Sequence, residues 1–213
     1  MSDRGSHDVT RRTYDTVAET YAARLRDELG GKPLDRALLT SLVERREPGT
    51  VVADLGCGPG HVAGWLAARG VRTVGVDLSS AMVAVGRREF PGVEFREGDL
   101  LALPAADGEF GAAVALYSVI HLAPAELTRA FDEAHRALRP AGLLLVSFHV
   151  GSEVRHLDDW WGHEVDVDFR FLETARVAAA LEEAGFAVEM RMERTHCADE
   201  AATLRGYLLA RRD

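Results

Sequence analysis

The sequence predicts a doubly wound α/β domain, with helices on both faces of a mostly parallel sheet. From about residue 50 onward, short apolar runs alternate with longer amphipathic segments. The runs are apolar almost throughout, as expected of strands that are buried on both faces. Glycines follow several of the amphipathic segments, where a helix ends and the chain turns into the next strand. Together these patterns indicate the fold class.

Apolar runs predict six strands, at Thr50–Leu55, Val71–Val76, Val93–Arg96, Phe110–Leu116, Leu143–Phe148 and Phe186–Met190. A further apolar stretch, Thr203–Ala210, fits an antiparallel edge strand or a helix; as a strand, it makes the sheet seven-stranded. Helices are expected between the strands, at His61–Arg69, Ser79–Glu89, Pro124–Leu138 and Glu173–Ala184. Ser79 is the expected N-cap of its helix, while Gly70 and Gly185 follow helix ends.

The first 48 residues differ from the rest of the chain. Their apolar residues fall at helical spacing in two groups, Tyr14 to Leu29 and Leu34 to Leu42, which predicts two helices before the sheet. Residues 150–172 are expected to form a long connection, of the kind that carries function or moves. We therefore divide a single domain into residues 1–48, 49–149, 150–172 and 173–213, the last holding a helix and edge strands.

Composition narrows the function. The chain has 213 residues, enough for one domain with its own core, and a net charge of −9. This acidic balance argues against a dedicated nucleic-acid binder, so a small-molecule partner is expected. No apolar run approaches the roughly 18 residues of a membrane span, and the N-terminus has no signal-peptide pattern. The two cysteines, Cys57 and Cys197, fit a cytoplasmic protein with free thiols, either a monomer or a homodimer.

The strongest functional signal is a glycine-rich turn. A predicted strand ends in Asp54, and Gly56, Gly58 and Gly60 then alternate before a helix opens. Such a turn lets a ligand lie against bare backbone N–H groups at a helix start. The nucleotide-binding turn of dehydrogenases is similar, but its third glycine comes one place later, where this chain has His61.

Two further acids follow the next two predicted strands. Asp77 lies 21 residues after Gly56, a distance at which an acid can accept both hydroxyls of a ribose. Asp99 follows the third strand, where an acceptor suits the exocyclic amine of an adenine. Each acid alone fits a surface charge or a helix cap equally well. All three acids would nevertheless line the crevice at the carboxyl ends of the strands, which indicates a nucleotide-like ligand.

These motifs resemble those of the class I S-adenosylmethionine-dependent methyltransferases, a Rossmann-like family, and in particular their small-molecule, ubiquinone-biosynthesis-like branch. The resemblance covers about residues 14–186 and rests on Asp54–Gly60, Gly75–Ser79 with Met82, Gly98–Leu100 and Leu138–Leu143. It implies S-adenosylmethionine as cofactor and S-adenosylhomocysteine as product. Residues 1–48 would then be a lid, 49–149 the cofactor-binding core and 150–172 the substrate side.

The resemblance also implies roles for single residues. Asp54 would hold the amino group of the cofactor, Asp77 the ribose and Asp99 the adenine, while the glycines pack on the methionine part and the ribose. Met82 would cover an adenine face, and Tyr117 would lie beside the sulfonium. The lid tyrosines would close over the cofactor or, alternatively, pack an amphipathic helix on the core. The cofactor-binding residues implied are Tyr14, Tyr21, Asp54, Gly56, Gly58, Gly60, Asp77, Leu78, Met82, Asp99, Leu100, Tyr117 and Ser118.

His121 is the candidate catalytic residue. It follows the fourth predicted strand, where the transferred methyl group is expected, and an imidazole can take a proton near neutral pH. Turnover would then fall below about pH 6.5, and burial would move that midpoint lower. Alternatively, His121 only contacts the substrate or packs, because methyl transfer needs little beyond alignment and the exclusion of water.

Residues 149–163 hold weaker signals. His149, His156 and His163 recur every seven residues near acids, but they share no helical face, so no metal site is expected. Trp160 and Trp161 would either wall an apolar or aromatic substrate or stabilise the connection itself.

The sequence therefore predicts a methyltransferase that acts on a small-molecule nucleophile, which includes secondary metabolites. Residues 115–118 lack the Asn/Asp-Pro-Pro-Tyr cluster that enzymes methylating nucleic-acid bases carry at this place. A nicotinamide-dependent oxidoreductase stays open because of the glycine turn and Asp77, although His61 and Asp99 argue against it. A non-catalytic S-adenosylmethionine-binding protein, or sulfonium chemistry other than methyl transfer, also stays open, and so does the accepting atom.

Overall fold

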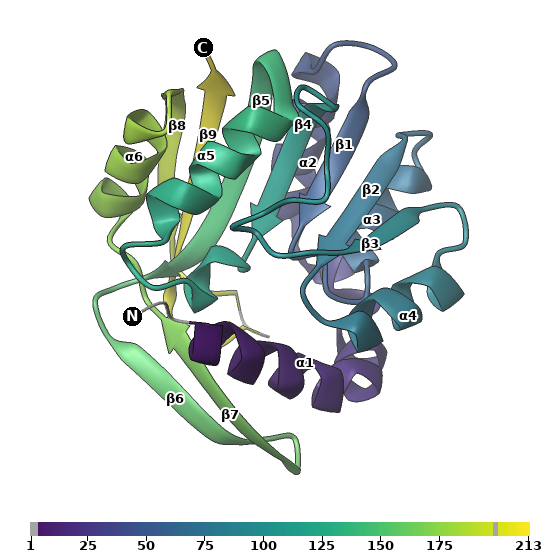
Figure 1. The fold of residues 1–213 in the computed structure, drawn as a ribbon, viewed down its shortest axis with the longest axis vertical. Helices are drawn as coiled ribbons and strands as arrows, with labels where there is room; N and C mark the ends of the chain where they lie inside the picture. The colour runs from purple at the N-terminus through teal and green to yellow at the C-terminus, as the bar shows by residue number, and fades with distance from the viewer. Residues whose placement is uncertain (1–3, 198–199) are drawn as a thin grey trace.

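A seven-stranded sheet forms the centre of the computed structural model, which describes residues 4–197 and 200–213 (Figure 1). The strand order is β3-β2-β1-β4-β5-β9-β8. The parallel part consists of β1 (Val51–Leu55), β2 (Thr73–Asp77), β3 (Glu94–Glu97), β4 (Phe110–Leu116) and β5 (Leu138–Val150). This arrangement confirms the predicted fold class.

The last strand lies inside the sheet rather than at its edge. β9 (Leu204–Arg212) pairs antiparallel with both β5 and β8 (Phe186–Arg194), so β8 is the edge strand. Strand β5 is longer than predicted because it begins directly after the helix, at Leu138. Its pairing with β4 shifts register between Phe110 and Ala112, and Ala141 lies in the bulged part with a φ of 62°. The Pro-Ala-Gly segment therefore belongs to the strand.

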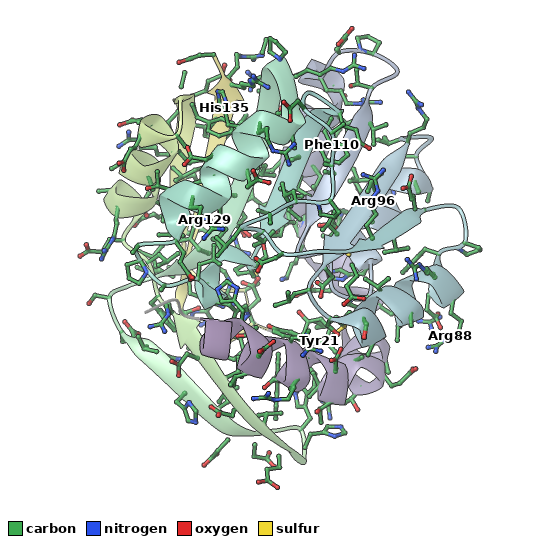
Figure 2. The ribbon with its side chains drawn as sticks, viewed as in Figure 1. Tyr21, Arg88, Arg96, Phe110, Arg129 and His135 are labelled. Atoms are coloured by element: carbon green, nitrogen blue, oxygen red, sulfur yellow. The ribbon has the colours of Figure 1, made fainter. Side chains whose placement is uncertain are left out.

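Helices cover both faces of the sheet (Figure 1). On one face, α2 (Pro33–Arg45) and α3 (His61–Ala67) pack Leu39, Leu42 and Leu66 against β1 and β4. On the other face, α5 (Leu127–Ala137) and α6 (Thr174–Glu183) form the larger core with Phe110, which Figure 2 labels. Helix α4 (Ser80–Glu89) packs beside β2 and β3, and its N-cap Ser79 accepts a hydrogen bond from the Met82 N–H, as predicted for a cap.

The carboxyl ends of the parallel strands are covered by two segments (Figure 1). Helix α1 (Arg4–Leu25) lies across them, and a hairpin of β6 (Val154–Trp160) and β7 (His163–Arg170) lies on its outer side. The long connection predicted at residues 150–172 thus contains two paired strands, which the sequence reading did not predict; Val165 and Val167 are buried in it. Short 3-10 helices lie at Glu28–Gly31 and Val119–His121.

Hydrogen bonds fix the hairpin on α1. The buried Thr13 hydroxyl donates to the Asp166 carbonyl oxygen at 3.0 Å and accepts from the Asp166 N–H at 3.3 Å. Thr20 and the His163 Nε2 are 2.9 Å apart. Among the described helices, none is both long and apolar enough to cross a bilayer.

Candidate active site

Two adjoining cavities lie at the carboxyl ends of the parallel strands. The first has a volume of about 810 Å³ and reaches from the glycine turn to Asp99. The second, of about 840 Å³, reaches from the same turn to Arg205 on β9. Both are lined by Tyr14, Tyr21, Gly56, Cys57, His61, Leu116 and Tyr117. A ligand in the first cavity can therefore present a group to a ligand in the second.

The glycine turn forms the common wall of the two cavities. Gly56, Gly58 and Gly60 have φ angles of 73°, 53° and 84°, a region that other residues rarely adopt. A Cβ on Gly58 would meet only the Tyr21 ring, at 3.8 Å, so this backbone faces the cavity. A Cβ on Gly56 would instead overlap Ser118, whose hydroxyl donates to the Leu55 carbonyl at 2.8 Å.

Asp77 is tied to this turn. Its Oδ2 accepts from the Gly58 N–H at 2.7 Å, and its Oδ1 accepts from the Ser79 N–H at 2.9 Å. Burial raises the pKa of Asp77 to about 6, although both hydrogen bonds favour the ionised form. Its carboxylate therefore reaches the cavity as a partly desolvated acceptor that a donor from a ligand would stabilise.

Asp99 lies at the other end of the first cavity. Its Oδ1 accepts from the Leu101 N–H at 2.9 Å, and its Oδ2 is 3.1 Å from the Nδ1 of His7 on α1. The second nitrogen of His7 is 3.2 Å from Glu126, so this histidine joins the start of α1 to the cavity rim. Leu78 and Leu100 line the cavity between the two acids.

Asp54 lies on the side of the second cavity and does not line the first. It is 2% exposed, and its Oδ2 accepts from the Ala63 N–H at 3.0 Å, in the first turn of α3. Burial raises the pKa of this carboxyl to about 7. A cationic group in this cavity would therefore restore its charge.

His121 has a defined tautomer. Its Nδ1 is 3.1 Å from the Asp168 carbonyl oxygen, which can only accept, so Nδ1 carries the proton. Its Nε2 is then an acceptor and receives the Tyr14 hydroxyl at 2.7 Å. Burial lowers the pKa of His121 to about 4 and raises that of Tyr14, so both groups are neutral at pH 7. The imidazole is thus a free base whose lone pair is held by the helix that covers the site.

The hairpin supplies an aromatic wall to the second cavity. Trp160 and Phe169 line it, with ring centroids 5.4 Å apart. Trp161 lies beside Tyr21 and under the guanidinium of Arg24, at 4.9 Å, and does not line the cavity. Of the two roles considered for these tryptophans, Trp160 fits a wall of the substrate cavity, whereas Trp161 packs on α1.

The three spaced histidines lie in different places. His149 lines the second cavity, His163 contacts Thr20, and the exposed His156 is 3.1 Å from an Asp168 oxygen. Across residues 4–197 and 200–213, no three potential metal ligands gather.

Comparisons with known proteins agree with this geometry. Residues 52–142 match the family model described as a methyltransferase domain. A demethylmenaquinone methyltransferase of Beutenbergia cavernae is 36% identical over 149 residues, which are 68% of this chain and 59% of that protein. Residues 52–142 therefore belong to a methyltransferase domain. The chain spans about half the length of the curated relatives it matches.

Solved structures share the fold of this methyltransferase domain. The 1,6-didemethyltoxoflavin-N1-methyltransferase of Burkholderia thailandensis, solved with 1,6-didemethyltoxoflavin and S-adenosylhomocysteine, has a TM-score of 0.76. It is 19% identical, and the match covers 100% of this chain and 91% of the other. The cyclase SpnF has a TM-score of 0.66 at 22% identity, covering 94% and 97%. The fold is therefore shared with a protein named for a different reaction.

Two of the predicted cofactor residues do not reach either cavity of the methyltransferase domain. Met82 is fully buried with Val17 and Val85 in the contact between α4 and α1, so it is not positioned to cover a ligand in the first cavity. Gly60 is needed for packing, because a Cβ there would overlap the ring of Phe95. The resemblance implied a cofactor contact for both residues, but it could not tell which side of each segment faces the cavity.

Several cavity residues were missed by sequence reasoning. His7 and Thr10 line the first cavity, while Lys32, His149 and Arg205 line the second. None belongs to a local motif, because tertiary contacts of α1, the 3-10 helix and β9 bring them to the site. His61, which we weighed only against a dehydrogenase turn, lines both cavities, and its buried Nδ1 has no partner within the described residues. Its position after the glycine turn was the available signal.

Proposed function

We propose that this protein transfers a methyl group from S-adenosylmethionine to a small-molecule nucleophile. The observation that carries this proposal is the first cavity of the methyltransferase domain. Gly58, Asp77 and Asp99, which follow three successive parallel strands, line it together. Such ends of strands at one crevice are the usual ligand site of doubly wound sheets.

The residues present fit S-adenosylmethionine. Each Asp77 oxygen accepts one backbone hydrogen bond and keeps a lone pair for a ribose hydroxyl. Asp99 and Leu100 would face the adenine, and His7 would yield its contact with Asp99 to the exocyclic amine. Asp54, whose pKa burial raises, would regain its charge beside the amino group of the methionine part. The same contact would lower the pKa of Asp54.

The remaining cofactor contacts come from the end of β4 and from α1. Tyr117 and Ser118 line the first cavity beside Gly56 and would lie next to the sulfonium. Tyr14 and Tyr21 also line it and would cover the cofactor from α1. We propose that residues 1–48 act as the lid of a core at 49–149, with the hairpin of 150–172 on the acceptor side and 173–213 completing the sheet.

His121 would serve as the base for a hydroxyl or amine acceptor. Bound S-adenosylmethionine would supply an electrophilic methyl group: the acceptor's nucleophilic atom would form a bond to it as the methyl–sulfur bond breaks, and the sulfur would keep that electron pair in S-adenosylhomocysteine. The Nε2 of His121 takes the proton that this atom loses, because its lone pair is available at neutral pH. For this, the Tyr14 hydroxyl must give up its hydrogen bond to Nε2. The walls of Tyr14, Trp160 and Phe169 would exclude water and hold the acceptor in line.

Isothermal titration calorimetry tests the cofactor assignment. S-adenosylhomocysteine should bind, and NADH should not. Asp77→Ala should weaken binding at least about tenfold, because a charge-assisted hydrogen bond contributes roughly 1.5–3 kcal/mol. Asp107→Ala is the matched control, since this exposed acid pairs with Arg136 away from both cavities. The melting temperature of each variant checks that it is folded.

The outcomes separate the alternatives. Binding of NADH instead would favour an oxidoreductase, and unchanged affinity in a folded Asp77→Ala variant would reject the assignment of Asp77. A screen of metabolite extract with methyl-labelled cofactor then tests turnover and reports the acceptor. Cofactor binding without any labelled product would leave a binding protein or another sulfonium reaction. We also propose a cytoplasmic monomer or homodimer that does not bind nucleic acid, supported by the free thiols and the net charge of −9.

A further inference from the structure

Arg205 occupies an unusual position in the second cavity. It lies near the start of β9, opposite His149 at the carboxyl end of β5, so it reaches the same edge of the sheet as the cofactor site. Its side chain lines the cavity, although the residue is only 4% exposed. A buried guanidinium normally has its charge matched by a carboxylate at hydrogen-bond distance.

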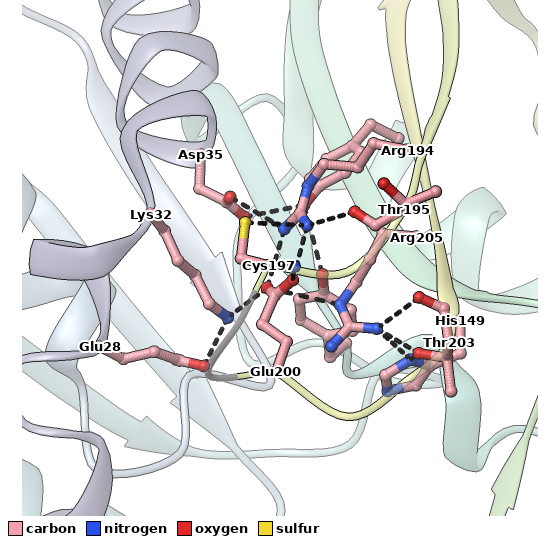
Figure 3. Close-up of polar contacts among 12 residues, drawn as sticks. Glu28, Lys32, Asp35, His149, Arg194, Thr195, Cys197, Glu200, Thr203 and Arg205 are labelled. Atoms are coloured by element: carbon pink, nitrogen blue, oxygen red, sulfur yellow. Dashed lines mark hydrogen bonds and ion pairs between the residues drawn. The ribbon is translucent and has the colours of Figure 1, made fainter.

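The carboxylate paired with Arg205 is Glu200, which lies 3.5 Å from its Nε and accepts no hydrogen bond from it (Figure 3). Its Nη1 donates to the Thr203 carbonyl at 3.1 Å and also contacts the Thr203 hydroxyl. Its buried Nε makes no hydrogen bond, and the second terminal nitrogen carries no dashed line in Figure 3. The second terminal nitrogen, with its two N–H donors, therefore has no partner among the described residues.

The nearest carboxylate is already engaged. Glu200 lies 3.5 Å from the Nε of Arg205, but it accepts from both terminal nitrogens of Arg194, at 2.6 and 2.8 Å. Lys32, the single lysine of the chain, is likewise held by Glu28 at 2.5 Å. The other acid of this cluster, Asp35, accepts from the Tyr207 hydroxyl at 3.1 Å. The guanidinium of Arg205 thus keeps an unused pair of donors.

The surroundings of His149 carry positive charge. Burial lowers the pKa of this imidazole to about 4, Arg205, Arg155 and Lys32 lower it further, and Glu200 raises it. His149 and Arg205 are themselves close, with Nδ1 and Nη1 3.4 Å apart. An anion at this end of the cavity would meet a favourable field.

Aromatic rings line the rest of the second cavity. The Tyr117 ring lies between the two buried cations, 5.4 Å from the Lys32 Nζ and 5.8 Å from the Arg205 guanidinium carbon. Its centroid is 5.1 Å from that of His149, and Trp160 and Phe169 complete the wall on the hairpin side. A flat ring can therefore lie between aromatic faces while its acidic substituent reaches Arg205.

We propose that Arg205 binds the carboxylate of an aromatic acid in the second cavity, and that this acid is the methyl acceptor. The inference rests on the proposed function. The carboxylate of the cofactor is the other source of this chemistry, but the glycine turn follows β1, and β9 is three strands away in the sheet order. At the usual strand spacing the two backbones are about 14 Å apart, and the affinity of Arg205→Met for S-adenosylhomocysteine separates the two sources.

The probes are four aromatic acids, each paired with its amide: benzoate, 4-hydroxybenzoate, 2-naphthoate and indole-3-acetate. Their affinities are measured by calorimetry at pH 7.5, with and without saturating S-adenosylhomocysteine. At least one acid should bind about tenfold more tightly than its amide, because a charge-assisted pair with Arg205 is lost in the amide. Arg205→Met should reduce this preference to within about twofold. Arg191→Met, which removes an exposed cation that pairs with Glu182 and lines neither cavity, should retain it.

The results that would overturn the role of Arg205 differ from those that would reject the proposed function. If no acid is preferred over its amide by wild-type protein, the proposal is overturned whether or not Arg205→Met folds. It is also overturned if the preference survives in folded Arg205→Met, or if that variant loses affinity for S-adenosylhomocysteine alone. Failure of S-adenosylhomocysteine to bind the wild type would reject the proposed function, while the acid–amide comparison without it still tests Arg205.

Discussion

The ends of β1 and β2 differ from the segments after β4 and at the end of β5 in the sign of the charge that burial disfavours. On the side of the glycine turn, burial raises the pKa of Asp54 to about 7 and that of Asp77 to about 6. On the opposite side, burial lowers the pKa values of His121 and His149 to about 4. The first wall is therefore stabilised by a donor or a cation, and the second holds unprotonated bases beside buried cations. A cofactor with an ammonium and a sulfonium fits the first, and an acidic acceptor that loses a proton fits the second.

The same two regions differ in how the chain builds them. The cofactor side comes from residues that directly follow β1, β2 and β3, so its acids recur with the strand–helix alternation. The acceptor side combines α1, the end of β4, the hairpin and β9, which are far apart in the sequence. Under the proposed function, the first region binds the cofactor and the second binds the acceptor. The predictions below test whether they act separately.

The largest effect is expected where the two regions meet, at His121. If it takes the acceptor's proton, His121→Ala should lower kcat by about 10²–10⁴ and leave S-adenosylhomocysteine affinity intact. Steady-state kinetics with the acceptor found in the extract screen, together with calorimetry, provide the two measurements. A modest loss confined to KM would instead show that His121 only contacts the substrate.

The pH profile gives a second test of His121. Because its pKa is about 4 in the folded protein, the free base persists and kcat should stay level from pH 8 to about pH 5. The unperturbed value of about 6.5 would place the fall in rate higher. The folded pKa lies below the unfolded one, so this residue's contribution to stability is complete above pH 6.5 and is lost as the pH falls toward 4. An NMR titration of labelled histidine checks the pKa directly, and a midpoint near 6.5 would contradict the buried, neutral state.

The different construction of the two regions also explains which site residues could be predicted from the sequence. Asp77 and Asp99 were predictable because each follows a strand, and parallel strands end at one edge. Arg205 was not, because only the antiparallel pairing of β9 with β5 brings it opposite His149. The hairpin was missed because residues 150–172 alternate only weakly, and its two strands bury Val165 and Val167 alone. Met82 lies on a helix, as predicted, but α1 covers the face of that helix on which it lies, so it does not line the cavity.

A substitution in the glycine turn should affect the cofactor side with a smaller effect. Gly58→Ala puts a methyl group into the first cavity and forces a φ of 53° on alanine, which costs about 1–2 kcal/mol. We expect a fall in Tm of about 2–8 °C and a loss of S-adenosylhomocysteine affinity of about tenfold. Gly70→Ala is the matched control, with a φ of 77° and open space around its Cβ. It should lose similar stability and bind normally; normal binding by Gly58→Ala would make the turn merely structural.

The smallest effect is expected at the contact between the hairpin and α1. Thr13→Val keeps the shape of the buried side chain but removes its hydrogen bonds to the Asp166 backbone, which should cost about 1 kcal/mol of unfolding free energy. Tm should fall by about 2–4 °C, and amide hydrogen exchange in β6 and β7 should accelerate about fivefold. Thr16→Val serves as control, because that hydroxyl bonds only the Arg12 carbonyl of its own helix. S-adenosylhomocysteine affinity should change by less than about twofold in both variants. If Thr13→Val weakened it as much as Gly58→Ala, the hairpin would have to be counted as part of the cofactor site, and the separation of the two regions would be lost.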